Sequence, residues 1–386
     1  MALRALPDVS VARAGHSRGM RKPRAMVVAA ATALCVPALF IPTAAAAAGD
    51  LSLPAPTGHN AVGRATLALT DRTRTDPWVP EAGPRQLMVT MYYPAVRGTG
   101  SQAPYMDVAE AGALVDHYEI RAQLPPEKLA RARTWSRTDA RPLPGKRPLV
   151  LLSPGYTVSR YSLTALAEDL ASRGYITAAV DHAFESVAAK FPGGVLPCTA
   201  CELPDKIGHG PIALNRATDL SFVLNELRHH PLIDQRHIAV VGHSMGGDAA
   251  ATVMRADSRV DAGINMDGPM LPPDPLNRPF LLFGGPELHD PGHAKDTSWD
   301  AVWPHMSGWK RWLHAPDADH FSFTDLNLLI QQAGIDPPTP LDPARGISLT
   351  RTYVAAFVDQ HLRGIPQRVL NGPTAEFPEI KFHNLR

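Results

Sequence analysis

The pentapeptide Gly-His-Ser-Met-Gly at residues 242–246 constrains the fold of this chain more than any other feature. Residues 238–241 before it are apolar and mostly β-branched, which predicts a short buried strand. Residues 247–254 after it are mostly small and predict the start of a helix. A serine between two glycines, where a strand turns into a helix, is typical of a nucleophile at the edge of a parallel sheet. The glycines leave room for the tight turn, and the helix start favours negative charge beside Ser244.

Apolar strand patterns and helical patterns alternate over most of the chain. This alternation predicts a mostly parallel sheet with helices on both faces, which is the α/β-hydrolase architecture, in one catalytic domain over residues 49–386. The predicted strands are 62–70, 86–93, 148–152, 175–180, 238–241, 261–266, 279–283 and 308–314. The predicted helices are 161–172, 213–228, 247–254 and 349–362.

Residues 104–140 interrupt this pattern and predict a helical insertion, with helices at 109–117 and 126–135. Such an insertion can act as a lid that offers apolar surface to a lipid, or it can pack against the domain as an appendage. Both alternatives stay open from the sequence.

The N-terminal residues 1–48 predict a signal peptide and a secreted protein. A basic cluster at residues 21–24 precedes an uncharged run over 25–48, whose small C-terminal residues suit cleavage before Gly49 or Asp50. The run is long enough for a retained membrane anchor, but its two prolines and its alanine tract favour cleavage.

The charge of the chain excludes one class of partner. The net charge is +1, and residues 1–48 carry +5 of it, so the remainder carries −4. No basic patch is present in the sequence, and we expect no nucleic acid partner.

After cleavage two cysteines remain, Cys198 and Cys201, in a C-x-x-C arrangement. In an exported protein this pair predicts a small-loop disulfide. A thioredoxin-like redox role is the alternative, but the pair lies in a loop rich in proline and glycine rather than at a helix start. No further ligands are spaced to make a metal site with them.

A serine hydroxyl needs a base to become a nucleophile, and the base needs a third group to hold it. In this architecture the chain order is serine, acid, histidine. His320 suits the base best, because it lies in the loop after the last predicted strand, whereas His314 lies in that strand and His361 on the last helix. His289, His293 and His305 are further candidates.

Two aspartates can be the acid that holds the base. Asp267 ends the predicted strand 261–266, and Asp290 lies in the loop after the strand 279–283. Position alone permits either acid, since both follow strands between Ser244 and His320.

An oxyanion hole needs two backbone N–H donors. One is expected at Met245, directly after Ser244, and the other in the loop 153–157. Pro154 has no N–H, so Tyr156 is the expected donor.

Three further side chains near the predicted site, His182, Glu185 and His243, can have structural rather than catalytic roles. His243 is expected to pack beside the nucleophile, because the turn fixes its backbone. His182 and Glu185 follow the strand 175–180 and either line the mouth of the site or lie behind it.

Several motifs together resemble the platelet-activating-factor acetylhydrolases and related bacterial lipases. These are Ser-Pro-Gly-Tyr at 153–156, Leu-Ala-Glu-Asp-Leu-Ala-Ser-Arg-Gly-Tyr at 166–175, Asp-His at 181–182 and the serine pentapeptide. The resemblance extends from about Val62 to the C-terminus. The family's first loop usually reads Ser-His-Gly, so Pro154 is a departure.

The resemblance implies a Ser-Asp-His triad, no cofactor, and hydrolysis of short or oxidised acyl esters. Acetylhydrolase members have the acid at the position of Asp267, and the related lipases and polyester hydrolases have it one strand later, at the position of Asp290. The residues around Asp267 are the better match, so we favour Asp267.

We therefore expect a secreted serine esterase or lipase with Ser244, Asp267 and His320 as the triad and Tyr156 and Met245 as the oxyanion hole. The expected substrate is a small-molecule or lipid ester, with no cofactor and no metal, and a transient contact with a lipid surface is compatible with it. The alternatives are a long-chain lipase or polyester hydrolase on the same fold, and a non-catalytic binding protein.

Overall fold

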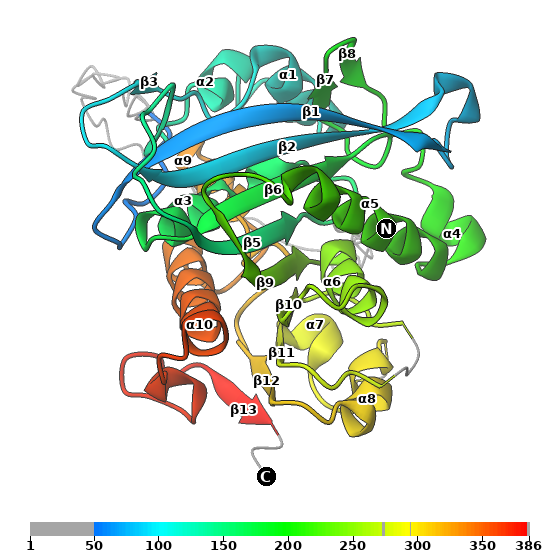
Figure 1. Ribbon diagram of the computed structural model, residues 1–386, viewed down its shortest axis with the longest axis vertical. Helices are drawn as coiled ribbons and strands as arrows, with labels where there is room; N and C mark the ends of the chain where they lie inside the picture. The colour runs from blue at the N-terminus through cyan, green and yellow to red at the C-terminus, as the bar shows by residue number, and fades with distance from the viewer. Residues whose placement is uncertain (1–49, 272–274, 294, 384–386) are drawn as a thin grey trace, which may run out of the picture. The chain divides into compact units, whose positions relative to one another are not determined.

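The computed structural model describes residues 50–271, 275–293 and 295–383 (Figure 1). The fold described below belongs to the compact unit of residues 47–386. The predicted signal peptide at 1–48 lies outside the described residues. Within the described residues, no helix is long and apolar enough to cross a membrane.

This compact unit is built on an 11-stranded sheet of order β13-β12-β11-β10-β9-β5-β6-β2-β1-β4-β3. The strands on the N-terminal side are β1 (Ala61–Thr75), β2 (Pro84–Ala95), β3 (Ser101–Gln102), β4 (Ser136–Thr138), β5 (Arg147–Ser153) and β6 (Ile176–His182). The others are β9 (Ile233–His243), β10 (Ala262–Met266), β11 (Phe280–Gly284), β12 (Lys310–His314) and β13 (Lys381–His383). A separate hairpin joins β7 (Ala189–Phe191) to β8 (Gly194–Leu196).

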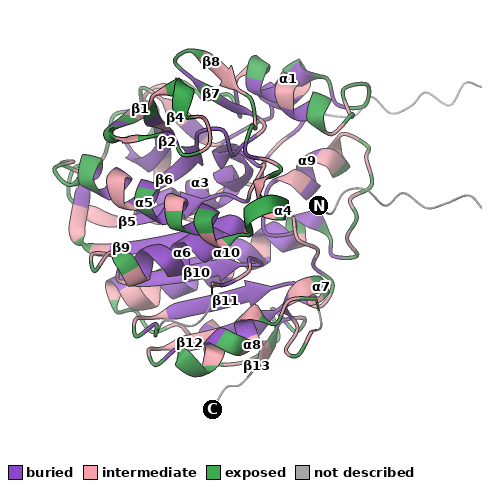
Figure 2. Cartoon of the chain, turned by 90° about the vertical axis from the view of Figure 1, so that its right-hand side faces the viewer, coloured by how far each residue is buried: buried purple, intermediate pink, exposed green. Residues whose placement is uncertain are grey.

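The middle of the sheet is parallel, as predicted. Strands β6, β5, β9, β10, β11 and β12 pair in parallel, and β2 and β13 continue the sheet in the antiparallel direction at its two sides. Every residue of β6 and β10 is buried, because helices cover both faces of a parallel sheet. Figure 2 shows these central strands in the buried colour.

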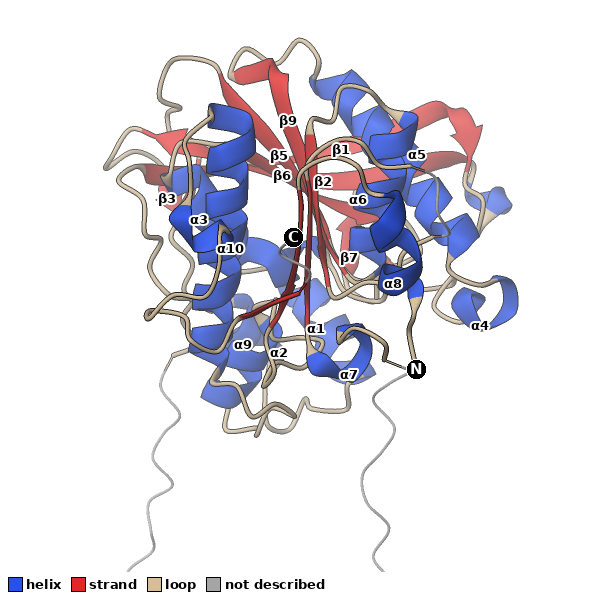
Figure 3. Cartoon of the chain, turned by 90° about the horizontal axis from the view of Figure 1, so that it is seen from below, coloured by secondary structure: helices blue, strands red, loops and turns tan. Residues whose placement is uncertain are grey.

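Helices cover the two faces of the sheet (Figure 3). On one face, α3 (Thr164–Ser172) and α10 (Pro343–Arg363) contribute to an apolar core with the sheet. On the other face, α5 (Gly210–Leu227) and α6 (Met245–Ala256) pack in a second core. This is the α/β-hydrolase fold that the sequence predicts.

Some helix boundaries differ from the prediction for local reasons. Helix α10 begins at Pro343 rather than at residue 349, because Asp342 caps it by accepting a hydrogen bond from the Arg345 amide at 2.9 Å. The predicted helix 126–135 ends early, as α2 (Pro126–Ala130), because the Trp135 amide donates to the Glu168 carboxylate instead.

The insertion 104–140 contains α1 (Val108–His117), α2 and the short strand β4, which pairs with β1. A capping box of Asp107 and Glu110 starts α1. Most apolar side chains of α1 and α2 are buried in one cluster with Leu328 of α9 (Leu326–Gln332) and Ile347 of α10, whereas Val108 at the start of α1 is exposed. These contacts place most of the apolar surface of the insertion inside the fold.

Candidate active site

Ser244 lies in a strained turn between β9 and α6. Its backbone has φ 53° and ψ −125°, a conformation rarely adopted by residues other than glycine. A side-chain carbon at Gly242 would collide with the Gly246 carbonyl, and one at Gly246 with the Ser153 carbonyl. The two glycines are therefore required by the packing of this turn, and the Ser244 side chain is held at a partly exposed edge of the sheet.

The turn that contains Asp267 packs directly on the turn that contains Ser244. The Ser244 amide donates to the Met266 carbonyl at 2.8 Å, and Asp267 has φ 56°. Gly268 follows so closely that a side-chain carbon there would collide with the Ser244 carbonyl. The ends of β9 and β10 thus hold Ser244 and Asp267 as one rigid unit.

Asp267 and His320 form a hydrogen-bonded pair. The distance from His320 Nδ1 to Asp267 Oδ2 is 2.7 Å, and Asp267 is buried, whereas the His320 side chain is 29% exposed. Burial alone would raise the pKa of Asp267, but hydrogen bonds from His289 and His320 hold it well below its usual range. Asp267 is thus a carboxylate near neutral pH, and the Nε2 atom of His320 is left for another partner.

A second histidine contacts the same carboxylate. His289 Nδ1 lies 2.8 Å from Asp267 Oδ1, and the His289 ring stacks on Trp299 with 4.1 Å between centroids. Its Nε2 lies 3.4 Å from Asp296 Oδ2. Burial disfavours a charged imidazole, but the two carboxylates outweigh this effect and raise the pKa of His289 to about 9. A cationic His289 therefore helps to keep Asp267 ionised.

Asp290, the alternative acid, contacts a different histidine. It follows α7 (Pro286–His289), its side chain is 50% exposed, and its Oδ1 lies 3.2 Å from His314 Nδ1. The structure brings His320 together with Asp267 and groups Asp290 with His314 and His383.

The predicted oxyanion donors lie in two different elements, the start of α6 and the loop after β5. Met245 is the first residue of α6, and its N–H is one of the amides that a helix start leaves without an intrahelical partner. Tyr156 lies in the loop after β5, next to Thr157, whose φ is 69°. Arg216 holds this loop from below, donating to the Pro154 carbonyl at 2.6 Å.

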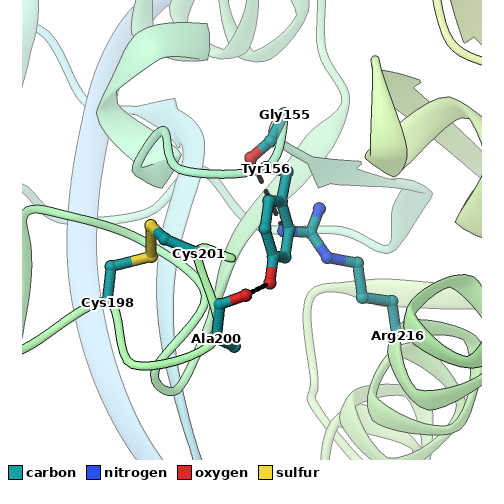
Figure 4. The surroundings of a disulfide bond; sticks show 6 residues. All are labelled: Gly155, Tyr156, Cys198, Ala200, Cys201 and Arg216. Carbon is teal, nitrogen blue, oxygen red and sulfur yellow. Dashed lines mark hydrogen bonds between the residues drawn. A yellow bond between two sulfur atoms is a disulfide. The ribbon is translucent and has the colours of Figure 1, made fainter. Parts of the chain in front are cut away.

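Tyr156 is also held through its side chain (Figure 4). Its hydroxyl donates to the carbonyl of Ala200, which lies between the disulfide-bonded Cys198 and Cys201. The guanidinium of Arg216 lies 5.7 Å from the centroid of the Tyr156 ring. The predicted disulfide is present, and it fastens the loop that contacts Tyr156.

His182 and Glu185 lie behind the site and not at its mouth. Both are buried: His182 contacts Asp219 at 2.8 Å through Nδ1 and Ser153 Oγ at 3.2 Å through Nε2. Glu185 accepts a hydrogen bond from Arg216 Nε at 2.6 Å. They belong to a buried network of charged groups beneath the oxyanion loop, with Arg85 and Asp219 at its centre.

His243 packs beside the nucleophile turn, as predicted. Its Nε2 donates to the His320 carbonyl at 2.7 Å, and the two imidazole centroids are 4.7 Å apart. Burial lowers the pKa of His243 to about 3, so the ring stays neutral and positions the His320 loop.

The comparison with known families identifies the chain. A family model described as platelet-activating factor acetylhydrolase, isoform II, matches residues 49–192 and 198–279. The chain belongs to this family.

Known relatives of this acetylhydrolase family member are ester hydrolases by name. A probable 1-alkyl-2-acetylglycerophosphocholine esterase of Arthroderma benhamiae is 26% identical over 92% of this chain and 97% of its own length. The platelet-activating factor acetylhydrolase of Canis lupus familiaris is 30% identical over 33% of this chain and 36% of its own. Among solved structures, a ferulic acid esterase from Streptomyces cinnamoneus is similar, with a TM-score of 0.77, 41% identity, and coverage of 87% of this chain and 100% of that one. This acetylhydrolase family member is a carboxylic ester hydrolase.

Proposed function

We propose that the protein hydrolyses esters through an acyl-enzyme, with Ser244 as nucleophile, His320 as base and Asp267 as the group that holds the base. The observation that carries the proposal is the 2.7 Å contact between His320 Nδ1 and buried, ionised Asp267. With Nδ1–H donated to Asp267, the Nε2 atom of His320 is the one that can take a proton from Ser244 Oγ. The strained turn of Ser244 supports the same role.

In the first half-reaction, Ser244 Oγ attacks the ester carbonyl carbon and its proton passes to His320 Nε2. The amides of Met245 and Tyr156 are proposed to bind the resulting oxyanion. His320 then protonates the leaving alcohol, which departs. In the second half, water attacks the acyl-enzyme with the same proton transfers, and the acid is released while Ser244 is restored.

The substrate is proposed to be a short-chain acyl ester or an acetylated phospholipid. The two proposed oxyanion residues belong to one apolar cluster, in which the partly buried Trp78, Tyr156, Leu203 and Leu271 pack against Ile212, Ala213 and Met245. An acyl group rather than a charged group suits such a cluster. The family match and the name of the Arthroderma benhamiae relative support an acetyl ester.

A feruloyl ester is the second candidate substrate. The observation that favours it is the 41% identity to a ferulic acid esterase over 87% of this chain. A panel of p-nitrophenyl esters of increasing chain length, methyl ferulate and an alkyl-acetyl phospholipid distinguishes the candidates by their kcat/KM values. A preference for long-chain esters or polyester films would instead support a lipase or polyester hydrolase.

We propose export by a signal peptide and transient contact with lipid surfaces. Ile207 at the end of α4 (Leu203–Ile207) and Leu214 on α5 are 43% and 57% exposed, close in sequence to the apolar cluster. Changing both to serine should lower turnover of vesicle-borne substrate and spare turnover of soluble p-nitrophenyl acetate. Equal effects on both substrates would argue against a lipid-docking role.

Ser244→Ala is the direct test of the mechanism. The variant should lose kcat by a factor of about 10⁴ or more while keeping its melting temperature, because the hydroxyl forms the covalent intermediate. Labelling by a fluorophosphonate should disappear with it. Near-normal turnover in this variant would overturn the proposal.

Asp267→Asn tests the acid. The asparagine keeps the shape but cannot hold the imidazole in the required tautomer, so kcat should fall by a factor of about 10³–10⁴. Asp317→Asn, on the exposed part of the same loop as His320, is the matched control. A severe loss in Asp290→Asn with a mild one in Asp267→Asn would transfer the role to Asp290.

A further inference from the structure

Two residues that the catalytic constellation leaves aside, Asp290 and His314, meet a third, His383, at one side of the sheet. Asp290 follows α7, His314 ends β12, and His383 ends β13. The register pairs Trp312 with His383 and His314 with Lys381, so both histidines are on the same face of the antiparallel pair. We call these three residues the His-Asp-His cluster.

The donor atoms of the cluster converge on one point. His314 Nδ1 lies 3.2 Å from Asp290 Oδ1 and 3.4 Å from His383 Nε2, and His383 Nε2 lies 3.8 Å from the same carboxylate oxygen. All of these atoms lie within 4.8 Å of one another. The three side chains come from separate elements of the chain, and each contributes one atom.

These separations are those expected between the ligand atoms of a metal ion. A tetrahedral zinc ion with bonds of about 2.0–2.1 Å has ligand atoms about 3.3–3.4 Å apart. Octahedral magnesium, with bonds of similar length, would bring neighbouring ligands to about 3.0 Å. By contrast, the Asp267 carboxylate contacts its two histidines at 2.7 and 2.8 Å, as direct hydrogen bonds do.

The chemistry of the donors also suits zinc. Two imidazoles and one carboxylate are nitrogen and oxygen ligands that zinc accepts. His314 is buried and Asp290 is half exposed, which leaves access for an ion and a water molecule.

We propose that Asp290, His314 and His383 bind one zinc ion, with water in the fourth position. The ion fastens the short strand β13 to β12 and to the residue that follows α7. Asp290 directly follows His289, which donates to Asp267, so the ion steadies the segment beside the proposed triad acid. It takes no part in the proposed acyl transfer and does not depend on it.

Lys381 provides a test that distinguishes zinc binding at this cluster from adventitious binding. It lies on β13 opposite His314, so its positive charge is close to the cluster. The same charge must weaken cation binding. Lys381→Gln should therefore tighten zinc binding severalfold, which adventitious binding elsewhere on the surface would not show.

Titration of the chelator-treated full chain with zinc chloride tests the proposal. We expect one ion per chain with Kd at or below about 10 µM. We also expect a melting temperature raised by about 2–4 °C at saturation. Cobalt bound in its place should show visible absorption of tetrahedral strength.

Variants locate the ion. His383→Ala and Asp290→Asn should each weaken zinc binding at least about tenfold and abolish the thermal shift, with melting curves in chelator used to verify folding. His237→Ala is the matched control, because His237 forms an exposed pair with Asp234 at 3.1 Å, and it should leave binding unchanged. Absence of saturable binding up to about 1 mM, or binding that survives His383→Ala, would overturn the proposal.

Discussion

Asp248 is a buried carboxylate in α6, one turn after the nucleophile. Its Oδ1 accepts a hydrogen bond from the Leu271 amide at 3.0 Å, and its Oδ2 is buried without a hydrogen-bond partner in the described part of the chain. Burial raises the pKa of Asp248 to about 7. The folded protein therefore binds this proton more tightly than the unfolded chain does, whose carboxyl keeps an ordinary pKa.

This carboxyl makes stability fall as pH rises. Because the pKa of Asp248 is raised in the folded protein, its contribution to the free energy of unfolding is largest below the ordinary pKa of a carboxyl group. This contribution is lost as the pH rises to about 7. Relative to Asp248→Asn, the wild-type free energy of unfolding should fall by about 2–3 kcal/mol between pH 5 and pH 8. Urea unfolding at the two pH values measures it. Asp317→Asn, an exposed control, should show no such difference, and a pH-independent gap for Asp248→Asn would contradict the assignment.

At the residue scale, the sequence predicts the candidate catalytic residues better than the residues that hold them in place. Motif and chain order indicate Ser244 and His320 but leave Asp267 and Asp290 open. The family resemblance favours Asp267, and the structure brings Asp267 and His320 into contact. His289 appears in the sequence only as one more candidate base, since nothing local indicates that α7 turns it onto Asp267. Arg216 gives no signal either, because its contact with the Pro154 carbonyl joins residues far apart in the chain.

At the scale of elements, the oxyanion loop is fastened by its neighbours. The Tyr156 hydroxyl donates to Ala200, which the Cys198–Cys201 disulfide holds in place, and Arg216 supports the loop from the other side (Figure 4). The position of the Tyr156 amide therefore depends on a loop that carries no catalytic group.

Replacing Cys198 and Cys201 with serine should loosen this loop. We expect a loss of about 2 kcal/mol or less in the free energy of unfolding, because the bridge closes a short loop. We also expect a severalfold lower kcat with KM nearly unchanged, since oxyanion contacts form in the transition state. Tyr156→Phe keeps the backbone donor and should lower kcat similarly with a smaller effect on stability. A double variant with normal kcat would show that the disulfide does not position the loop.

Elements with a strong periodic pattern are predicted well, and short ones are not. The parallel strands β5, β6 and β9–β11 contain short apolar runs that predict them. The short strand β13 and helix α7 are too brief to produce a pattern, and their places depend on pairing with distant residues. The early start of α10 is visible only through the Asp342 cap, because its first turn is less apolar than the rest.

At the scale of the molecule, the N-terminal boundary of the folded unit is testable. Leu51 and Leu53 are buried, and the Leu53 carbonyl accepts a hydrogen bond from Trp135 Nε1 at 2.9 Å. A chain that begins at Asp50 should keep the kcat/KM and melting temperature of the full-length chain. A chain that begins at Thr57 should lose about 3–6 kcal/mol of stability, because it lacks both buried leucines. Loss of activity already in the longer chain would contradict the signal-peptide assignment.

The close packing of the Ser244 turn against the Asp267 turn determines which positions of this enzyme can be substituted. Since Gly268 abuts the Ser244 carbonyl, a change in either turn displaces both reacting groups at once. Random libraries should therefore recover almost no active clones with substitutions at Gly242, Gly246 or Gly268. Diversity aimed at new ester specificities belongs at Trp78, Leu203 and Leu271, whose side chains pack in the same apolar cluster as Tyr156 and Met245.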